Sequence, residues 1–256
     1  MKKILAMAAI ALFMVSCTDD DSNSTQTGNK LIKVTETDSD GDFVSTLTYD
    51  GNKLIEINSN DGEKSVITYT GDLITEWKSY DADNQLIYKD TYEYNSQNQL
   101  VTYTEFAYDD EFGDDVYKTT YVHNSNGTIS FTEYYSDNID NPDSFTQDAT
   151  GTITETTLTT VYGTGEDTEV YTYTFDGKNN PLKGITGMDK IAFANTMGTT
   201  KFYNENVVSQ SYSYNGGASV VESTTVYTYN AANYPLTQTE TQVNGGYTST
   251  TVYTYE

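Results

Sequence analysis

The sequence has no arginine, one cysteine, one histidine and three prolines among its 256 residues. A single Cys cannot form an internal disulfide, and one Cys with one His cannot complete a Cys/His zinc site. The lack of Arg removes the forked group that commonly grips phosphate. Acidic residues number 38 against 13 lysines, which gives a formal charge of -25. A chain this acidic repels phosphate backbones, so we expect no nucleic-acid partner.

Tyrosine and threonine are abundant, and they alternate along the chain. There are 24 Tyr and 9 Phe, which is more aromatic content than a disordered acidic chain carries. Tyr171, Tyr173 and Phe175 alternate with Thr172 and Thr174, so the rings share one face of an extended strand. The pattern predicts an all-β body with one buried face.

The N-terminus has the pattern of a secretory signal. Lys2 and Lys3 precede an unbroken apolar run over residues 4–15, and the small residue Ser16 follows. The run is too short to span a bilayer comfortably, so we interpret residues 1–16 as a cleaved signal peptide. A plain signal peptide with an incidental Cys17 is the alternative.

Met14-Val15-Ser16-Cys17 resembles the lipobox of bacterial lipoproteins, with Met where Leu is commonest. The resemblance implies lipidation of Cys17, palmitate included, and a membrane partner through that anchor. Residues 17–29 are polar and read as a flexible tether. The acids after Cys17 resemble the export signal of surface lipoproteins in Bacteroidetes. We therefore expect an outer-membrane location facing the cell surface, with a periplasm-facing location as the alternative.

Residues 30–256 repeat one motif, in which an aromatic residue is followed by Asp or Asn, a few polar residues, and then Leu or Ile. Asn, Asp and Gly tolerate the positive φ of tight hairpins. The motif resembles the YD-type repeats of bacterial surface lipoproteins of unknown function, a resemblance that covers most of the mature chain. It implies one domain, an antiparallel meander of hairpins that forms a curled open sheet. Examples are Tyr49-Asp50-Gly51-Asn52-Lys53-Leu54, Tyr94-Asn95-Ser96-Gln97-Asn98-Gln99-Leu100 and Phe175-Asp176-Gly177-Lys178-Asn179-Asn180-Pro181-Leu182.

One stretch, 184–203, breaks the repeat. Met188, Ile191, Ala192 and Phe193 have helical spacing, which predicts about two turns with one apolar side. We interpret the segment as a short helical or irregular plug that covers an open end or edge of the sheet. A ligand-gating or partner-docking element is the alternative.

Signals of catalysis are nearly absent from the sequence. His123 lies in or beside a turn, and no Gly-x-Ser-x-Gly elbow accompanies it. No Walker loop or dinucleotide fingerprint occurs, so we expect no nucleotide partner. Carboxylates are plentiful, but most, such as Glu56, Glu76, Glu93 and Glu105, are expected to be solvated. The chain is therefore predicted not to be an enzyme and to carry no cofactor.

Two acidic clusters are weak calcium candidates, because hard carboxylate oxygens are calcium's ligands. Neither matches an EF-hand loop, and the alternative is a hydrated loop that keeps strand edges apart. The candidates are Asp38, Asp40 and Asp42 in the first cluster and Asp109, Asp110, Asp114 and Asp115 in the second.

The aromatic rows have two interpretations. Rings on an exposed sheet face, Trp77 among them, could stack on sugars. We favour the alternative, in which cross-strand ladders of tyrosine supply the core, because aliphatic residues are scarce. The ladder residues are Tyr171, Tyr173, Tyr227, Tyr229, Tyr253 and Tyr255.

The sequence thus predicts a membrane-anchored, non-catalytic binding or structural module, with polysaccharide or an envelope protein as the expected ligand. The alternative is a glycan-active hydrolase that uses a carboxylate pair in a cleft of the sheet.

Overall fold

The computed structural model describes residues 29–38, 41–108, 114–138, 144–163, 165, 167–194, 198–243 and 246–256. Within them the chain is all-β apart from one helical turn, α1, at Met188–Ile191. The strands are β1 (Leu31–Asp38), β2 (Gly41–Asp50), β3 (Lys53–Ser59), β4 (Lys64–Thr70), β5 (Leu73–Tyr80), β6 (Leu86–Tyr94), β7 (Leu100–Ala107), β8 (Asp115–His123), β9 (Ile129–Ser136), β10 (Thr146–Ile153), β11 (Thr157–Tyr162), β12 (Asp167–Phe175), β13 (Val207–Tyr214), β14 (Val220–Tyr229), β15 (Pro235–Gln242) and β16 (Thr248–Tyr255).

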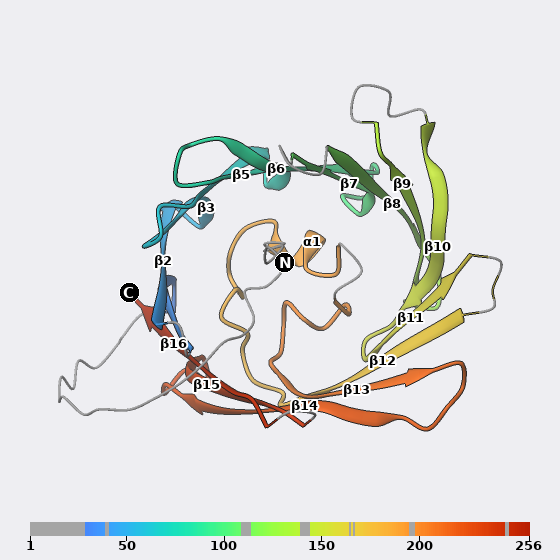
Figure 1. Ribbon diagram of the computed structural model, residues 1–256. Helices are drawn as coiled ribbons and strands as arrows, with labels where there is room; N and C mark the ends of the chain where they lie inside the picture. The colour runs from blue at the N-terminus through green and yellow to red at the C-terminus, as the bar shows by residue number, and fades with distance from the viewer. Residues whose placement is uncertain are drawn as a thin grey trace.

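The sheet is a closed barrel of 16 antiparallel strands, and the expected curled open sheet is wrong (Figure 1). Each strand pairs with the next along the chain, and β16 then returns to pair with β1. The closing register sets Val34 opposite Tyr253 and Glu36 opposite Thr251. Closure gives the backbone groups of both terminal strands a partner, so the sheet has no exposed edge.

The repeated sequence motif corresponds to one hairpin and one hydrogen bond. In six of the eight even-numbered strands, an aromatic residue near the end of the strand bonds to a carbonyl oxygen at or near the start of the preceding strand. Tyr69 Oη donates to the Leu54 carbonyl oxygen, for example, at 3.2 Å. The same bond recurs at five further positions around the barrel: Tyr49 to Leu31, Tyr94 to Ile74, His123 to Leu100, Tyr227 to Val207 and Tyr255 to Pro235.

The segment 176–206, between β12 and β13, enters the barrel and closes one end of it (Figure 1). We call this segment the plug, and the end that it closes the plug end. The plug end also carries the turns at 51–52, 71–72 and 95–99. The opposite rim, with the connections at 60–63, 81–85 and 215–219, is the far end.

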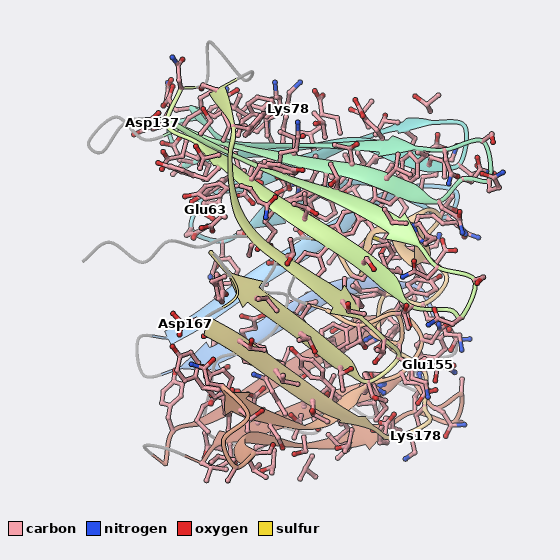
Figure 2. All side chains as sticks on the ribbon, turned by 90° about the vertical axis from the view of Figure 1, so that its right-hand side faces the viewer. Glu63, Lys78, Asp137, Glu155, Asp167 and Lys178 are labelled. Atoms are coloured by element: carbon pink, nitrogen blue, oxygen red, sulfur yellow. The ribbon has the colours of Figure 1, made fainter. Side chains whose placement is uncertain are left out.

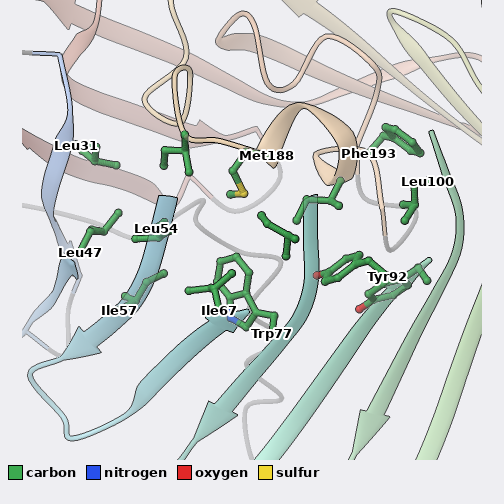
Figure 3. Packing of buried hydrophobic residues seen from close by; sticks show 14 of the residues in the cluster. Leu31, Leu47, Leu54, Ile57, Ile67, Trp77, Tyr92, Leu100, Met188 and Phe193 are labelled. Carbon is green, nitrogen blue, oxygen red and sulfur yellow. The ribbon is translucent and has the colours of Figure 1, made fainter. Parts of the chain in front are cut away.

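Apolar residues of the plug complete the core. Ile185, Met188, Ile191 and Phe193 are buried against strand residues, and Phe193 lies beside Leu100 (Figure 3). The predicted apolar spacing is therefore confirmed, although the helix has only 4 residues. We expected a plug that covers an open end or an edge of the sheet, and the segment closes one end of the barrel from inside. Among the described residues, no helix is long and apolar enough to cross a membrane.

The outer face of the barrel is polar. On β15, Thr237, Thr239 and Thr241 alternate with the buried Gln238 and Glu240, so the threonines point outward. Most other strands also place Thr, Ser or Lys outside, but valines lie among them, such as the exposed Val122, Val226 and Val252. A barrel embedded in lipid needs an outer apolar band roughly 25 Å tall with aromatic girdles. The outward residues of the described strands mix hydroxyl and lysine side chains with valines.

Candidate functional site: the lumen and its plug

The wall of the lumen changes in character from the plug end to the far end. At the plug end it is apolar and aromatic, and it packs on the plug. Tyr121 on β8 meets the Phe193 ring at 5.4 Å, and Tyr173 on β12 meets the Phe202 ring at 4.9 Å. These contacts identify the faces of β8 and β12 that point inward. Alternate residues along each strand, counted from Tyr121 or Tyr173, therefore line the lumen as well.

Small hydroxyl residues follow next along the wall. Ser65 and Ser79, on neighbouring strands, place their hydroxyl oxygens 3.2 Å apart. Thr119 on β8 and Thr160 on β11 are also buried. This buried hydroxyl layer lies between the apolar wall at the plug end and the tyrosines at the far end.

Tyrosines at the far end line a vestibule that water reaches. Tyr117, Tyr162 and Tyr214 are 42%, 36% and 46% exposed, although the alternation directs all of them inward. Inward-pointing rings retain this much exposure only where the space in front of them is not filled by protein. We use the name vestibule for this part of the lumen.

Carboxylates orient the vestibule tyrosines through hydrogen bonds. Tyr212 Oη donates to Glu169 Oε1 at 3.0 Å, and Tyr214 Oη donates to Asp167 Oδ1. The bond to Tyr214 lowers the pKa of Asp167, because it favours the charged carboxylate. On β9 and β8, Tyr135 Oη donates to Asp115 Oδ1 at 2.7 Å, and on β11 Tyr162 Oη donates to Glu169 Oε2 at 3.3 Å.

The charges on the inner wall of the described strands are acidic. Lys64, Lys78, Lys89 and Lys118 each stand next to an inward residue in their strand and therefore point outward. Because the lysines lie outside and the carboxylates inside, the lumen has a negative potential, and the low dielectric constant of the walls strengthens it. The inward carboxylates are Glu36, Asp90, Glu105, Asp115, Glu133, Asp167, Glu169 and Glu240.

Asp90 and Glu105 form a half-buried acidic pair in the lumen. They are paired across β6 and β7, and the hydroxyl of Tyr103 lies 3.1 Å from Asp90 Oδ1 and 2.8 Å from Glu105 Oε2. Burial, with a further contribution from the charge of Glu105, raises the pKa of Asp90 to about 8. Burial also raises the pKa of Glu105. The pair therefore retains a proton near neutral pH.

Some of the predicted site residues lie outside the described residues. Cys17, the tether and three calcium candidates, Asp40, Asp109 and Asp110, fall there, so lipidation and calcium binding stay predictions. Asp42 accepts a hydrogen bond from Thr37 Oγ1 at 2.7 Å. Within the described residues, no group of three or more His, Cys, Asp or Glu is placed to hold a metal ion.

The other predicted residues are placed clearly. His123 contacts the Phe193 ring, and its Nε2 lies 2.8 Å from the Leu100 carbonyl oxygen, so it belongs to the packed wall. Trp77 is buried and offers no exposed platform for sugars. Glu105 faces the lumen and is half-buried, so the expectation that it is a solvated residue is wrong.

The tyrosine ladder is confirmed in part. Tyr173, Tyr253 and Tyr255 are buried in the core, and Tyr171 packs against it. Tyr171 also meets Tyr212 with ring centroids 5.0 Å apart. The vestibule tyrosines Tyr117, Tyr162 and Tyr214 were not singled out from the sequence. A signal exists in Asp167-Thr168-Glu169-Val170-Tyr171, where acids and rings share one face.

Comparisons with known proteins agree with the barrel. No family model and no curated protein matches the chain. A porin-like protein from Bacteroides vulgatus has a similar crystal structure, with a TM-score of 0.58 at 14% identity over 89% of this chain and 98% of that one. A porin-like protein from Bacteroides uniformis gives 0.53 at 14% identity over 91% and 99% of the two chains. At this identity the likeness establishes the fold.

These findings correct the expected identity and function. The structural neighbours are porin-like barrels, so the similarity to YD-repeat lipoproteins has no support as an identity. The lipoprotein binding module and the alternative glycan hydrolase are both wrong as expected functions, because the structural neighbours of the barrel are porin-like proteins. A closed barrel with an even number of strands is the architecture of bacterial outer-membrane barrels, whereas the mixed outer face described above differs from their apolar band.

Proposed function

We propose that this chain is a porin-like barrel of the outer membrane that admits small cationic or uncharged solutes into its lumen and stops them at the plug. The observation that carries the proposal is the partial exposure of three inward-pointing tyrosines, Tyr117, Tyr162 and Tyr214, beside carboxylates. A barrel of 16 strands is wide enough for an aqueous interior. The proposal includes no catalysis, in keeping with the transport role that a porin-like name suggests.

The sign of the wall charges determines which solutes enter. Rings of Asp and Glu favour cations in channels, and a negative cleft raises the local concentration of cations. The vestibule carboxylates Asp115, Asp167 and Glu169 would act in this way toward a solute arriving at the far end. The tyrosine faces add attraction, since a cation close to an aromatic ring is stabilised by its quadrupole.

The outer face limits how the barrel can associate with the membrane. Its threonines and lysines favour a wall that stands in water at the membrane surface. A channel that spans the bilayer is the second candidate, favoured by the closed barrel and its porin-like neighbours. Recording in planar bilayers separates the two, since stable conductance steps are expected only of a channel whose strands contact lipid.

The experiment for the vestibule compares thiol reagents of opposite charge in a Cys17→Ser background. Tyr117→Cys places a thiol on the inner face of β8. Val122→Cys, which is 62% exposed on the outer face of the same strand, is the matched control. We expect the cationic methanethiosulfonate to react at position 117 about tenfold faster than the anionic one, with a smaller preference at position 122.

Added salt tests whether the preference for the cationic reagent is electrostatic. Raising the ionic strength to about 1 M shortens the screening length and should reduce that preference at position 117. Equal rates for the two reagents at position 117, or no reaction there, would contradict the proposal.

A further inference from the structure

A polar groove lies where the plug meets the barrel rim. Its volume is about 830 Å³, within the roughly 300–1,000 Å³ of small-molecule sites. One wall is formed by the β4–β5 turn at 70–73 and by Asn98 of the β6–β7 turn. The plug forms the other wall, with Asp189, Lys190, Tyr203 and Asn204. A molecule in this groove would touch both the barrel and the plug.

Charges at the groove are balanced. Asp72 Oδ1 lies 3.3 Å from Lys53 Nζ, and Asp189 Oδ2 lies 2.7 Å from Lys190 Nζ. Each acid therefore has its own lysine, unlike the carboxylates of the vestibule. A charged ligand would have to compete with these pairs, whereas an uncharged ligand would not.

Hydrogen-bonding groups of both kinds are free in the groove. Asn98 and Asn204 are exposed to water in the groove, and their side-chain amides have no hydrogen-bond partner in the described parts of the chain, so each offers two N–H donors and one carbonyl acceptor. Tyr203 Oη accepts the Gly184 N–H at 2.8 Å. Because that bond uses a lone pair, the phenol proton stays available for donation.

We infer that this groove binds an uncharged polyhydroxylated molecule of monosaccharide to disaccharide size, which bridges the plug to the β4–β5 and β6–β7 turns. Hydroxyl groups both donate and accept, which matches the free amides and the phenol. The Tyr203 ring adds an aromatic surface for an apolar sugar face. The inference concerns the plug end and does not depend on the vestibule proposal.

Binding has a consequence for the plug. A ligand that contacts both walls binds only while the plug is seated, so it stabilises the seated arrangement by mass action. In a barrel that admits solutes, such a ligand would hold the plug in its seated position.

The test titrates the full chain with maltose and cellobiose as uncharged probes and with glucosamine and glucuronate as charged ones, followed by calorimetry. Asn98→Gly removes an amide and keeps a residue that accepts φ of 59°. Asn84→Gly, also at φ 59°, is the matched control on another hairpin turn. Tyr203→Phe removes the phenol proton donor.

We expect at least one uncharged sugar to bind more tightly than either charged probe. Its affinity should fall about tenfold in Asn98→Gly, which is about 1.4 kcal/mol, and should not change in Asn84→Gly. No binding of either uncharged sugar at millimolar concentration overturns the inference, and so does equal binding by the two glycine variants. The cysteine reactivity at position 117 is independent of both outcomes, so failure of one proposal is distinguishable from failure of the other.

Discussion

The hydroxyl of Tyr94, the last residue of β6, donates a hydrogen bond of 2.6 Å to the carbonyl oxygen of Ile74 near the start of β5. The acceptor lies 20 residues earlier in the chain. Because the bond ties the end of β6 to the beginning of β5, it holds these two neighbouring strands together at the plug end. This bond explains why an aromatic residue recurs at this position of the sequence motif.

The first prediction follows from that bond. Tyr94→Phe should lower the free energy of unfolding by about 1 kcal/mol, because the Ile74 carbonyl loses its side-chain donor. The measurement is urea unfolding at neutral pH. Tyr117→Phe is the control, since Tyr117 stands in the vestibule, and it should change stability by less than about 0.5 kcal/mol. Equal effects of the two variants would show that the Tyr94 hydroxyl does not stabilise the hairpin.

The local part of the fold is predictable from the sequence, because period-two alternation and turn residues act over a few positions. The hairpin at Tyr49-Asp50-Gly51-Asn52-Lys53-Leu54 forms as expected, with Gly51 at φ 59°. Closure is not predictable in this way. β1 and β16 lie at opposite ends of the chain, and an edge strand has the same alternation as a paired one. The curvature that brings them together depends on stagger summed over the whole sheet.

The candidate site, too, is predictable from the sequence only in its local features. The apolar spacing of Met188, Ile191 and Phe193 indicates a buried segment, but sequence does not tell an interior plug from an edge cover. Alternation places Glu169 and Tyr171 on one face without saying that this face borders water. Only the closed barrel makes the inner face a lumen, and so the vestibule emerges from tertiary structure.

The second prediction concerns how closely the plug approaches the rim. Gly187 has φ of 82°, and a Cβ there would lie 2.9 Å from the Asp72 carbonyl oxygen. Gly184 has φ of 100° with no atom within 4 Å of such a Cβ. Gly184→Ala should therefore cost about 1–2 kcal/mol from backbone strain alone, and Gly187→Ala should cost more.

Thermal unfolding followed by circular dichroism measures both variants, and limited proteolysis reports whether the plug has become accessible. A Gly187→Ala protein as stable and as protease-resistant as Gly184→Ala would show that the plug can move away from Asp72 without cost.

The third prediction tests the polar outer face. A protein comprising residues 29–256 should be monodisperse in buffer without detergent, because the outward residues of strands such as β15 are Thr237, Thr239 and Thr241. Water-soluble labels should then reach the outer wall of the barrel. Figure 2 shows one side of this wall, with Asp167 toward the far end and Glu155 toward the plug end. Size-exclusion chromatography with light scattering makes the measurement. Aggregation that only detergent reverses would instead favour a lipid-exposed wall.

The last prediction uses the acidic pair at Asp90 and Glu105. In the folded protein the pKa of Asp90 is about 8, far above the value of about 3.9 expected when unfolded. The folded state therefore holds the proton more tightly across the interval between these values. The resulting contribution to stability is complete below about pH 4 and is lost as pH rises through about 8. The free energy of unfolding should fall by a few kcal/mol between about pH 5 and pH 9.

Asp90→Asn removes the titrating group and should flatten that decline, whereas Asp50→Asn removes the same charge from the exposed end of β2 and should leave the slope unchanged. The comparison is needed because general repulsion in a chain of charge -25 also weakens as pH falls. Urea unfolding at a series of pH values gives the slopes. If Asp90→Asn and Asp50→Asn show the same slope as the unmodified chain, the carboxyl of Asp90 is ionised and hydrated in the lumen, and the Asp90–Glu105 pair does not share a proton.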